Sequence, residues 1–147
     1  MLLLCILFLF FLMPAAAWLG KRSFHAAVWL AILPAGLAAY FASLFPIVSS
    51  SGPIEVLYPW APSLGLSLSV FADGLSLLFA TLISGIGALI VIFSTRYFDG
   101  KPEAGRFQCI LFAFMASMLG VVLAGNLFTL FVSWELTGFT SFLLIGF

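Results

Sequence analysis

The chain has 147 residues, of which 65% are hydrophobic and 7% are charged, and its net charge is zero. Soluble domains contain about 45–50% apolar and about 25% charged residues, so most of this chain is expected to lie in a lipid bilayer. A neutral chain offers no electrostatic basis for binding nucleic acid. The composition therefore predicts an all-α integral membrane protein.

Five apolar stretches approach or reach the roughly 20 residues that a helix needs to cross a bilayer. We expect them to form five transmembrane helices in a single membrane domain, residues 1–147. The expected helices are Leu2–Leu19, Ala26–Ile47, Gly74–Thr95, Phe107–Ala124 and Leu127–Phe147.

The first stretch combines an apolar core with three small residues, Ala15–Ala17, as a cleavable signal peptide does. Lys21 and Arg22 follow this stretch, however, whereas a signal peptide has its basic residues in front. This order favours a retained helix with the N-terminus outside, and signal cleavage is the alternative.

The basic residues predict the orientation of the chain. Two of them lie between the first and second stretches and three between the third and fourth, so alternating spans place all five on one side. By the positive-inside rule this side is cytoplasmic, and the C-terminus is then cytoplasmic as well. The five residues are Lys21, Arg22, Arg96, Lys101 and Arg106.

The loop Val48–Ala72 is expected outside, because it carries Glu55 and no basic residue. Its segment Leu64–Phe71 alternates apolar and polar residues, the period of a β-strand, and this favours a short external β-hairpin. Asp73 follows as the predicted N-cap of the third helix, where its carboxylate accepts backbone N–H groups. A role for Asp73 in an ion path is the alternative.

Small residues recur every four positions on three of the expected helices, and close helix contacts in a bilayer require such residues. The spacing predicts packed faces rather than isolated helices. Gly125 and Asn126 leave only a short link between the last two helices, which are therefore expected to be antiparallel neighbours. The stripes are Ala80, Ser84 and Ala88, then Ala116 and Gly120, then Ser133, Thr137 and Ser141.

No metal site and no cofactor site is expected. Cys5 and Cys109 both lie in apolar runs, and His25 has no second imidazole, thiol or carboxylate beside it. The sequence offers no Ser–His–Asp set, no phosphate-binding loop and no carboxylate pair. These absences argue against a self-contained enzyme.

Glu135 lies near the middle of the last apolar stretch, about two residues from its midpoint. A carboxylate at this depth is costly, and such residues commonly belong to proton or ion pathways. Glu135 is then protonated, paired with a cation, or exposed to a hydrated cavity, and Gly138 one turn later leaves room for a partner. A structural hydrogen bond between helices is the alternative.

Two long segments carry a resemblance to a known family. They are FADGLSLLFATLISGIGALIVIFSTRYF, residues 71–98, and MLGVVLAGNLFTLFVSWELTGFTSFLLIGF, residues 118–147. They closely resemble the N-terminal part of the antiporter-like subunits, which include the A subunit of Mrp-type multisubunit Na+/H+ antiporters and chain 5 of respiratory complex I. The motif WELT…SFLLIGF is more similar to the corresponding segment of the Mrp A subunit than to that of chain 5.

The resemblance implies a multi-pass protein of the cell membrane that works with other membrane subunits on Na+ and H+. In that family the glutamate that matches Glu135 pairs with a lysine on a later helix, within a proton half-channel. The family protein continues for many more helices, so we expect this chain to be an N-terminal fragment or a split gene product. Alternatives are a membrane component of a proton-pumping NADH-quinone oxidoreductase or hydrogenase, and a structural subunit.

Overall fold

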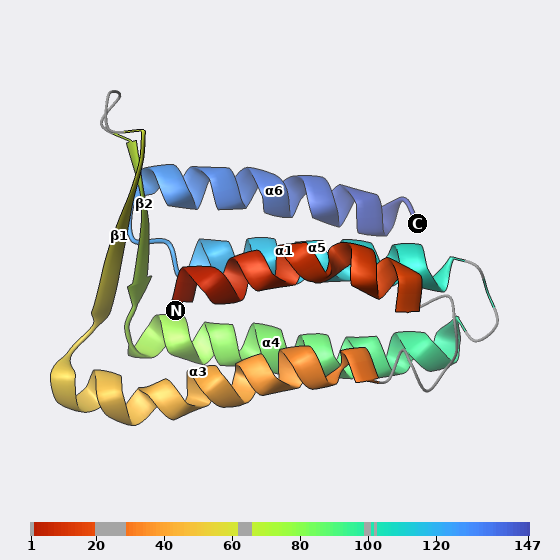
Figure 1. Ribbon diagram of the computed structural model, residues 1–147, viewed down its shortest axis with the longest axis horizontal. Coiled ribbons are helices and arrows are strands. Elements are labelled where there is room, and N and C mark those ends of the chain that lie inside the picture. The colour runs from red at the N-terminus through yellow and green to blue at the C-terminus, as the bar shows by residue number, and fades with distance from the viewer. Residues whose placement is uncertain (1, 20–28, 62–65, 99–100, 102) are drawn as a thin grey trace.

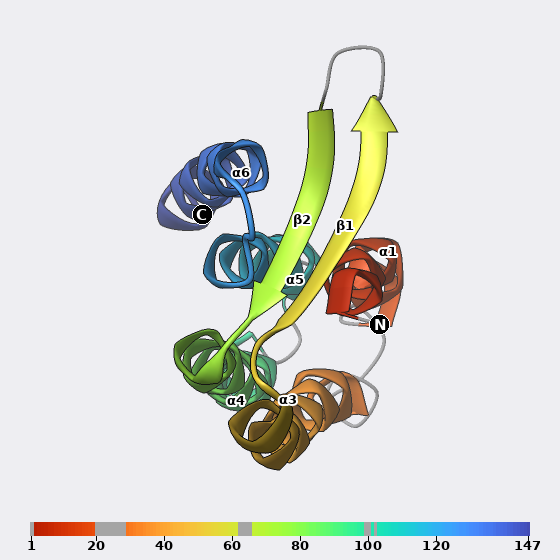
Figure 2. The ribbon, with the colours of Figure 1, turned by 90° about the vertical axis from the view of Figure 1, so that its left-hand side faces the viewer.

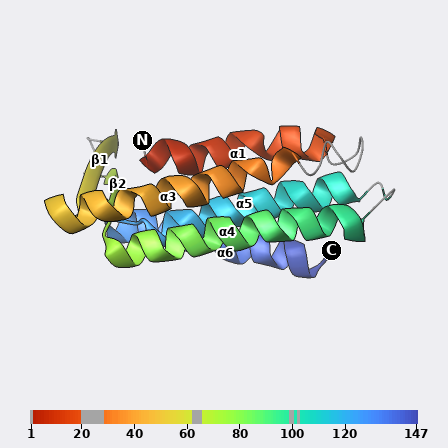
Figure 3. The same ribbon diagram turned by 90° about the horizontal axis from the view of Figure 1, so that it is seen from below.

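The computed structural model describes residues 2–19, 29–61, 66–98, 101 and 103–147. In this part of the chain, long helices run side by side and a two-stranded antiparallel sheet crosses one end of the bundle (Figure 1). The N-terminal end of the chain lies at the end of the bundle that carries the sheet, and the C-terminal end lies towards the opposite end (Figure 3). The elements are α1 (Leu2–Leu19), α3 (Ile32–Ser51), β1 (Ile54–Ala61), β2 (Leu66–Ala72), α4 (Gly74–Tyr97), α5 (Ala104–Val122) and α6 (Leu127–Ile145).

Helix α5 occupies the centre of the bundle, with α1, α4 and α6 around it, while α3 packs on the outside of α4 (Figure 2). The side chains of Phe112 and Leu119 on α5 are fully buried, as are Leu9 on α1 and Leu77 and Val91 on α4. The apolar core therefore lies between α1, α4 and α5.

Among the described residues, α3, α4, α5 and α6 are long and apolar enough to cross a membrane. Helix α1 adds a shorter apolar run, Leu2–Pro14. The predicted helical membrane architecture is confirmed, and four of the five predicted spans differ from the helices by three residues or fewer at each end.

Helix α3 is the exception, because it runs from Ile32 to Ser51 instead of Ala26 to Ile47. Trp29 and Leu30 are helical, and a turn at Ala31 separates them from α3. Pro34 has no N–H to donate to the carbonyl of Leu30 and its ring crowds that carbonyl, which explains the interruption. The predicted start of this span, and with it Lys21, Arg22 and His25, lies outside the described residues.

The predicted hairpin is present and joins the end of α3 to the start of α4. Strands β1 and β2 pair in antiparallel register, with Ile54 opposite Ala72. Strand β2 begins two residues later and ends one residue later than the alternating segment predicts. Trp60 of β1 stacks on Phe128 of α6, with 5.8 Å between ring centroids, so the hairpin also contacts the last helix.

The link between α5 and α6 lies along β2 almost as a third strand. The Phe71 N–H donates to the Leu123 carbonyl at 2.8 Å, and the Gly125 N–H donates to the Ser69 carbonyl at 2.8 Å. A Cβ atom at position 125 would collide with the Ser69 side chain, so any other residue there would force that side chain to shift. The short link makes α5 and α6 adjacent, as the sequence predicts.

The small-residue stripes on α4 and α5 are buried. Gly120 of α5 meets Ser133 of α6 so closely that a Cβ atom at position 120 would lie 2.5 Å from the Ser133 Oγ atom. On α6, however, the buried residues are Thr129, Ser133 and Thr140, and Ser133 alone belongs to the predicted stripe. Each four-residue step rotates the position by about 40°, so such a stripe stays buried on α4, which packs against both α3 and α5, but leaves the contact on α6, which packs against α5.

Candidate functional site

Glu135 lies almost at the middle of α6. The midpoint of Leu127–Ile145 is Leu136, so the Cα atoms of Glu135 and the midpoint differ by about 1.5 Å along the helix axis. The side chain is exposed, and it lies about 200° around the helix from Ser133, which contacts Gly120 of α5. A carboxyl group therefore lies at mid-depth on an open face of a helix that is long enough to span a membrane.

The start of α6 is fixed by polar contacts to the hairpin. The Asn126 side chain caps the helix, since its Oδ1 atom accepts the Thr129 N–H at 2.8 Å. The amide group of the same side chain donates to the Ser67 carbonyl at 2.7 Å. The Thr129 hydroxyl accepts the Ser69 N–H at 3.0 Å. These contacts hold one end of α6, and with it the depth of Glu135, relative to the hairpin.

The two faces of α6 differ sharply. One face packs on α5 through small polar residues, whose hydroxyl groups can bond back to carbonyls of their own helix, as Thr140 does to Leu136 at 2.7 Å. The other face exposes large apolar side chains and Glu135. Its aromatic members are Phe131, Trp134, Phe139 and Phe142, each 61–71% exposed.

Within the part of the chain that the structure describes, Glu135 has neither a hydrogen-bond partner nor an ion pair. A Cβ atom at Gly138, one turn further along, would meet no atom within 4 Å. The described cations Arg96, Lys101 and Arg106 lie at the end of the bundle opposite the hairpin. The face around Glu135 and Gly138 is therefore open and holds no described cation.

Asp73 is the N-cap of α4. Its Oδ1 atom accepts the Ser76 N–H at 2.7 Å. Hydrogen bonds from the backbone and then the side chain of Ser76 lower the pKa of the Asp73 carboxyl. The structure does not bring Asp73 and Glu135 together, because Asp73 begins α4 and Glu135 lies halfway along α6, with α5 between the two helices (Figure 2).

Sequence reasoning misses the buried side chain of Gln108 on α5, which is 1% exposed and whose amide group has no hydrogen-bond partner among the described residues. The Ser84 hydroxyl on α4, whose burial the small-residue stripe predicts, has no partner among them either. Unpaired polar groups are uncommon in protein interiors. A glutamine in a helix that is otherwise almost entirely apolar is the signal that identifies Gln108.

No group of three or more His, Cys, Asp or Glu residues in the described ranges lies close enough to hold a metal ion. Cys5 and Cys109 are free and half-buried. The chemistry that the described residues offer is thus confined to single carboxyl groups and to polar side chains inside the bundle.

Comparison with known proteins gives a consistent relationship. Residues 60–108 match the family described as NADH-ubiquinone oxidoreductase (complex I), chain 5 N-terminus. The A subunit of the Na+/H+ antiporter of Alkalihalophilus pseudofirmus is 46% identical to the chain over 127 residues, which are 86% of this chain and 16% of that protein. The chain is homologous to the N-terminal part of this antiporter protein. The corresponding A1 subunit of Staphylococcus haemolyticus is 41% identical over 126 residues, again 86% of this chain and 16% of that protein.

Solved structures agree with this homology. A chain in the structure of the Mrp complex from Dietzia sp. DQ12-45-1b superposes with a TM-score of 0.86 and is 32% identical, and the match covers 98% of this chain and 16% of that one. A chain of the membrane-bound sulfane sulfur reductase, an archaeal respiratory membrane complex, shares the fold at a TM-score of 0.71 and 22% identity, over 97% of this chain and 22% of that one.

Together the helices and the homology identify a multi-pass membrane protein. The chain spans about 16% of the length of the two antiporter relatives named above.

Proposed function

We propose that this chain forms the N-terminal part of the large subunit of a multisubunit Na+/H+ antiporter, and that Glu135 is its proton-carrying group. The homology to the antiporter proteins supports the class of transport. The observation that supports the residue is a carboxyl group at the middle of α6, on a face that no other described helix covers.

The cost of a charge in the bilayer explains how Glu135 would work. Insertion scales assign about 2.5–3.5 kcal/mol to an ionised aspartate at the centre of a membrane helix, so an ionised carboxylate at this depth is costly without a partner. A cation that approaches across the open side of Gly138 would stabilise the ionised form. Movement of that cation would then load and release a proton at Glu135. The resemblance to the family suggests a lysine on a later helix for this role.

The proposed orientation places the hairpin outside and the opposite end of the bundle in the cytoplasm. Glu55 and Asp73 lie at the hairpin end, and Arg96, Lys101 and Arg106 lie at the other. This separation agrees with the positive-inside rule. The proposed location is the cell membrane, with other membrane subunits as partners and Na+ and H+ as the transported ions.

The test is Na+/H+ exchange by the complete complex in membrane vesicles, with assembly measured separately. We expect Glu135→Gln to reduce exchange to the background of vesicles that lack the complex, because an amide cannot carry the proton. Glu55→Gln is the matched control, since it removes an exposed carboxylate from the hairpin, and it should leave exchange unchanged. Wild-type exchange in a fully assembled Glu135→Gln complex would refute the proposed role.

Comparison with Glu135→Leu separates transport from a structural role. If Glu135 only forms a hydrogen bond between helices, the glutamine variant keeps both assembly and exchange, whereas the leucine variant weakens assembly. The proposal instead expects both variants to lose exchange, including in the fraction of complexes that assembles normally.

A second candidate is a membrane component of a redox-driven proton pump. The match of residues 60–108 to complex I chain 5 favours it. The proteins that co-purify with the chain distinguish the antiporter from the redox-driven pump. Iron–sulfur or flavin proteins would indicate the redox-driven complex, and small membrane proteins alone would indicate the antiporter.

A further inference from the structure

The side chain of Gln108 on α5 carries a buried amide group without a protein partner. It is 1% exposed, so neither a further helix nor another subunit can reach it. The amide offers two N–H donors and an oxygen acceptor, and neither its nitrogen nor its oxygen has a hydrogen-bond partner among the described residues. A bilayer supplies no water to such a group, so an unpaired amide here is costly. Gln108 therefore indicates a small polar ligand inside the bundle.

Two buried serine side chains on the same pair of helices are paired within their own helix. The Ser94 hydroxyl on α4 donates to the Val91 carbonyl at 2.8 Å, and the Ser117 hydroxyl on α5 donates to the Ala113 carbonyl at 2.8 Å. Serine can do this because its short side chain lies beside the preceding turn. The longer side chain of Gln108 carries its amide past these carbonyls, so its partner must lie between helices.

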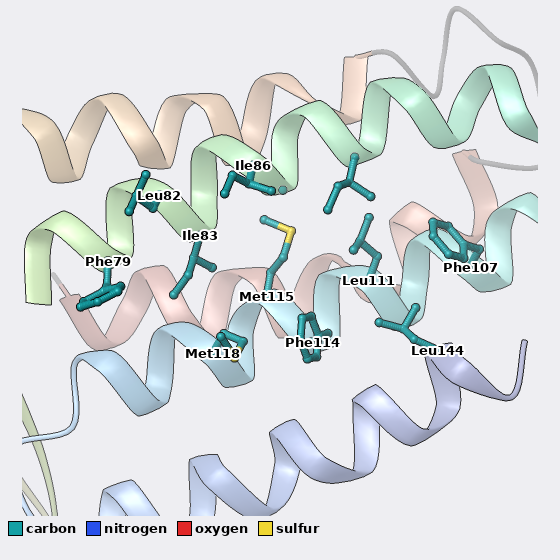
Figure 4. A pocket seen from close by; sticks show the side chains of 12 residues that line it. Phe79, Leu82, Ile83, Ile86, Phe107, Leu111, Phe114, Met115, Met118 and Leu144 are labelled. Carbon is teal, nitrogen blue, oxygen red and sulfur yellow. The ribbon is translucent and has the colours of Figure 1, made fainter.

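Two contacts between α4 and α5 lie on either side of Gln108. Met115 of α5 points towards α4, where a Cβ atom at Gly87 would collide with it (Figure 4). At the other side, the ring centroids of Phe98 and Phe107 are 4.9 Å apart. The two helices are therefore in contact both before and after Gln108, and these contacts fix which part of α4 lies opposite it.

The residue of α4 opposite Gln108 is Ser94. A step of seven residues advances a helix by about 10.5 Å and returns to within about 20° of the same side. Seven residues forward from Gly87 on α4 is Ser94. Because α5 runs in the opposite direction (Figure 1), the matching step on α5 goes seven residues back from Met115, to Gln108. Ser94 is 2% exposed, and its oxygen can still accept a hydrogen bond.

A hollow of about 180 Å³ beside Ser94 provides space for a water molecule, which occupies about 30 Å³ in the liquid. The lining of the hollow includes Ser94 and Phe107, the residue before Gln108. Gln108 is four residues from Ala104, the first residue of α5, so it lies about 6 Å inside the end of the bundle opposite the hairpin. The aqueous side of the membrane is therefore close.

We propose that Gln108 and Ser94 bind one ordered water molecule between α4 and α5. The water donates one hydrogen bond to the Ser94 oxygen, whose own proton is donated to Val91, and pairs with the Gln108 amide. Buried waters typically make about three hydrogen bonds to polar groups that otherwise have no partner. Such a water joins two helices much as a direct hydrogen bond does. The inference concerns the interior of the bundle and does not rest on the role of Glu135.

Electron cryomicroscopy of the complete complex, at a resolution that shows ordered water, tests the site. The expected map contains one density peak about 3 Å from the Gln108 amide and about 3 Å from the Ser94 Oγ atom. A direct hydrogen bond between the amide and a protein group would overturn the proposal. So would the lack of a peak in a map that shows other buried waters.

Two variants test whether Gln108 holds the water. Gln108→Met nearly keeps the length of the side chain and removes the amide, so the peak should be lost. Ser117→Ala is the matched control, because it removes a buried hydroxyl of the same helix that already bonds to the Ala113 carbonyl, and the peak should remain. An undiminished peak in the Gln108→Met complex would contradict the assignment.

Radiolytic footprinting gives a second readout, which does not depend on map resolution. X-rays convert a bound water into a hydroxyl radical that oxidises the side chains beside it, including those that bulk water cannot reach. Phe112, about one turn from Gln108, and Phe41 on α3 are both 0% exposed. We expect oxidation of Phe112 but not of Phe41 in the wild-type complex, and loss of the Phe112 signal in Gln108→Met.

Equal oxidation of Phe112 and Phe41 in the wild-type complex would overturn the proposal even if the Gln108→Met complex fails to assemble. Neither the map nor the footprint measures Na+/H+ exchange. A negative result for the water site therefore leaves the proposed function of Glu135 untouched.

Discussion

Helices α5 and α6 have the same length, 19 residues, and both are apolar enough to cross a membrane. Their surroundings are nevertheless opposite. In the most apolar part of α5, 61% of the residues are buried by other parts of the described chain, whereas in α6 the share is 11%. The carboxyl group at mid-depth belongs to the second of these helices.

This difference in burial indicates a structural role for α5 and makes α6 the candidate functional helix. Helix α5 contacts α1, α4 and α6. Its ionisable side chains, Arg106 and Cys109, both lie in its first two turns. Helix α6 is anchored by α5 and by the hairpin, and it presents Glu135 on its free side. A side chain that exchanges protons needs a changing partner, and the open face of α6 leaves room for one.

The largest effect on this arrangement is expected from Gly120→Leu. The new side chain would collide with Ser133, so α5 and α6 would be forced apart at a cost of about 1–3 kcal/mol or more. We expect a lower melting temperature of the detergent-solubilised complex and a loss of assembled complex. Gly85→Leu on α4 is the control, because a Cβ atom there meets nothing within 4 Å. Equal melting temperatures for the two variants would contradict the close α5–α6 contact.

A smaller effect is expected from Asn126→Ala at the start of α6. This change removes both the cap on Thr129 and the hydrogen bond to the Ser67 carbonyl. A lost N-cap costs about 1 kcal/mol and a lost hydrogen bond about as much again. Asn126→Asp keeps the cap and loses only the second bond, so it should destabilise the complex about half as much. Thermal unfolding measures both, and an alanine variant as stable as wild type would show that the hairpin does not hold α6.

The smallest effect is expected at Asp73, which caps α4. Its lowered pKa means that the folded state favours the ionised carboxylate, which therefore stabilises the protein above the ordinary aspartate pKa of about 3.9. This contribution is lost as the pH falls through the lower pKa of the folded state. Asp73→Asn keeps a capping oxygen without a charge, so its melting temperature should fall less than that of wild type on acidification towards about pH 3. The same pH dependence in both proteins would show that the cap charge adds no stability.

Much of this fold follows from hydropathy, because a bilayer requires long apolar helices whatever their neighbours are. The hairpin follows from the alternation before Asp73, and the burial of Ala80 and Ser84 follows from small-residue spacing. The break before α3 escapes prediction, because hydropathy does not register the effect of Pro34 on the preceding turn. The bounds of strand β1 also escape prediction, because the apolar Leu57 and Trp60 lie at exposed positions and hide the alternation.

The candidate site could be predicted only in part. Glu135 stands out from the sequence because a lone carboxyl group in a long apolar run is unusual wherever the helix begins and ends. The face of α6 on which the Glu135 side chain lies could not be predicted. The contact of Gly120 with Ser133 and the hydrogen bond of Asn126 to the hairpin decide which face of α6 packs on α5.

The most direct test of the central claim is infrared difference spectroscopy of the purified complex, recorded between low and high pH with and without Na+. We predict a carbonyl band of a protonated carboxyl group that is present at low pH, absent at high pH, and missing from Glu135→Gln. A spectrum that is the same for wild type and Glu135→Gln under all these conditions would contradict the claim, because Glu135 would then keep one protonation state throughout.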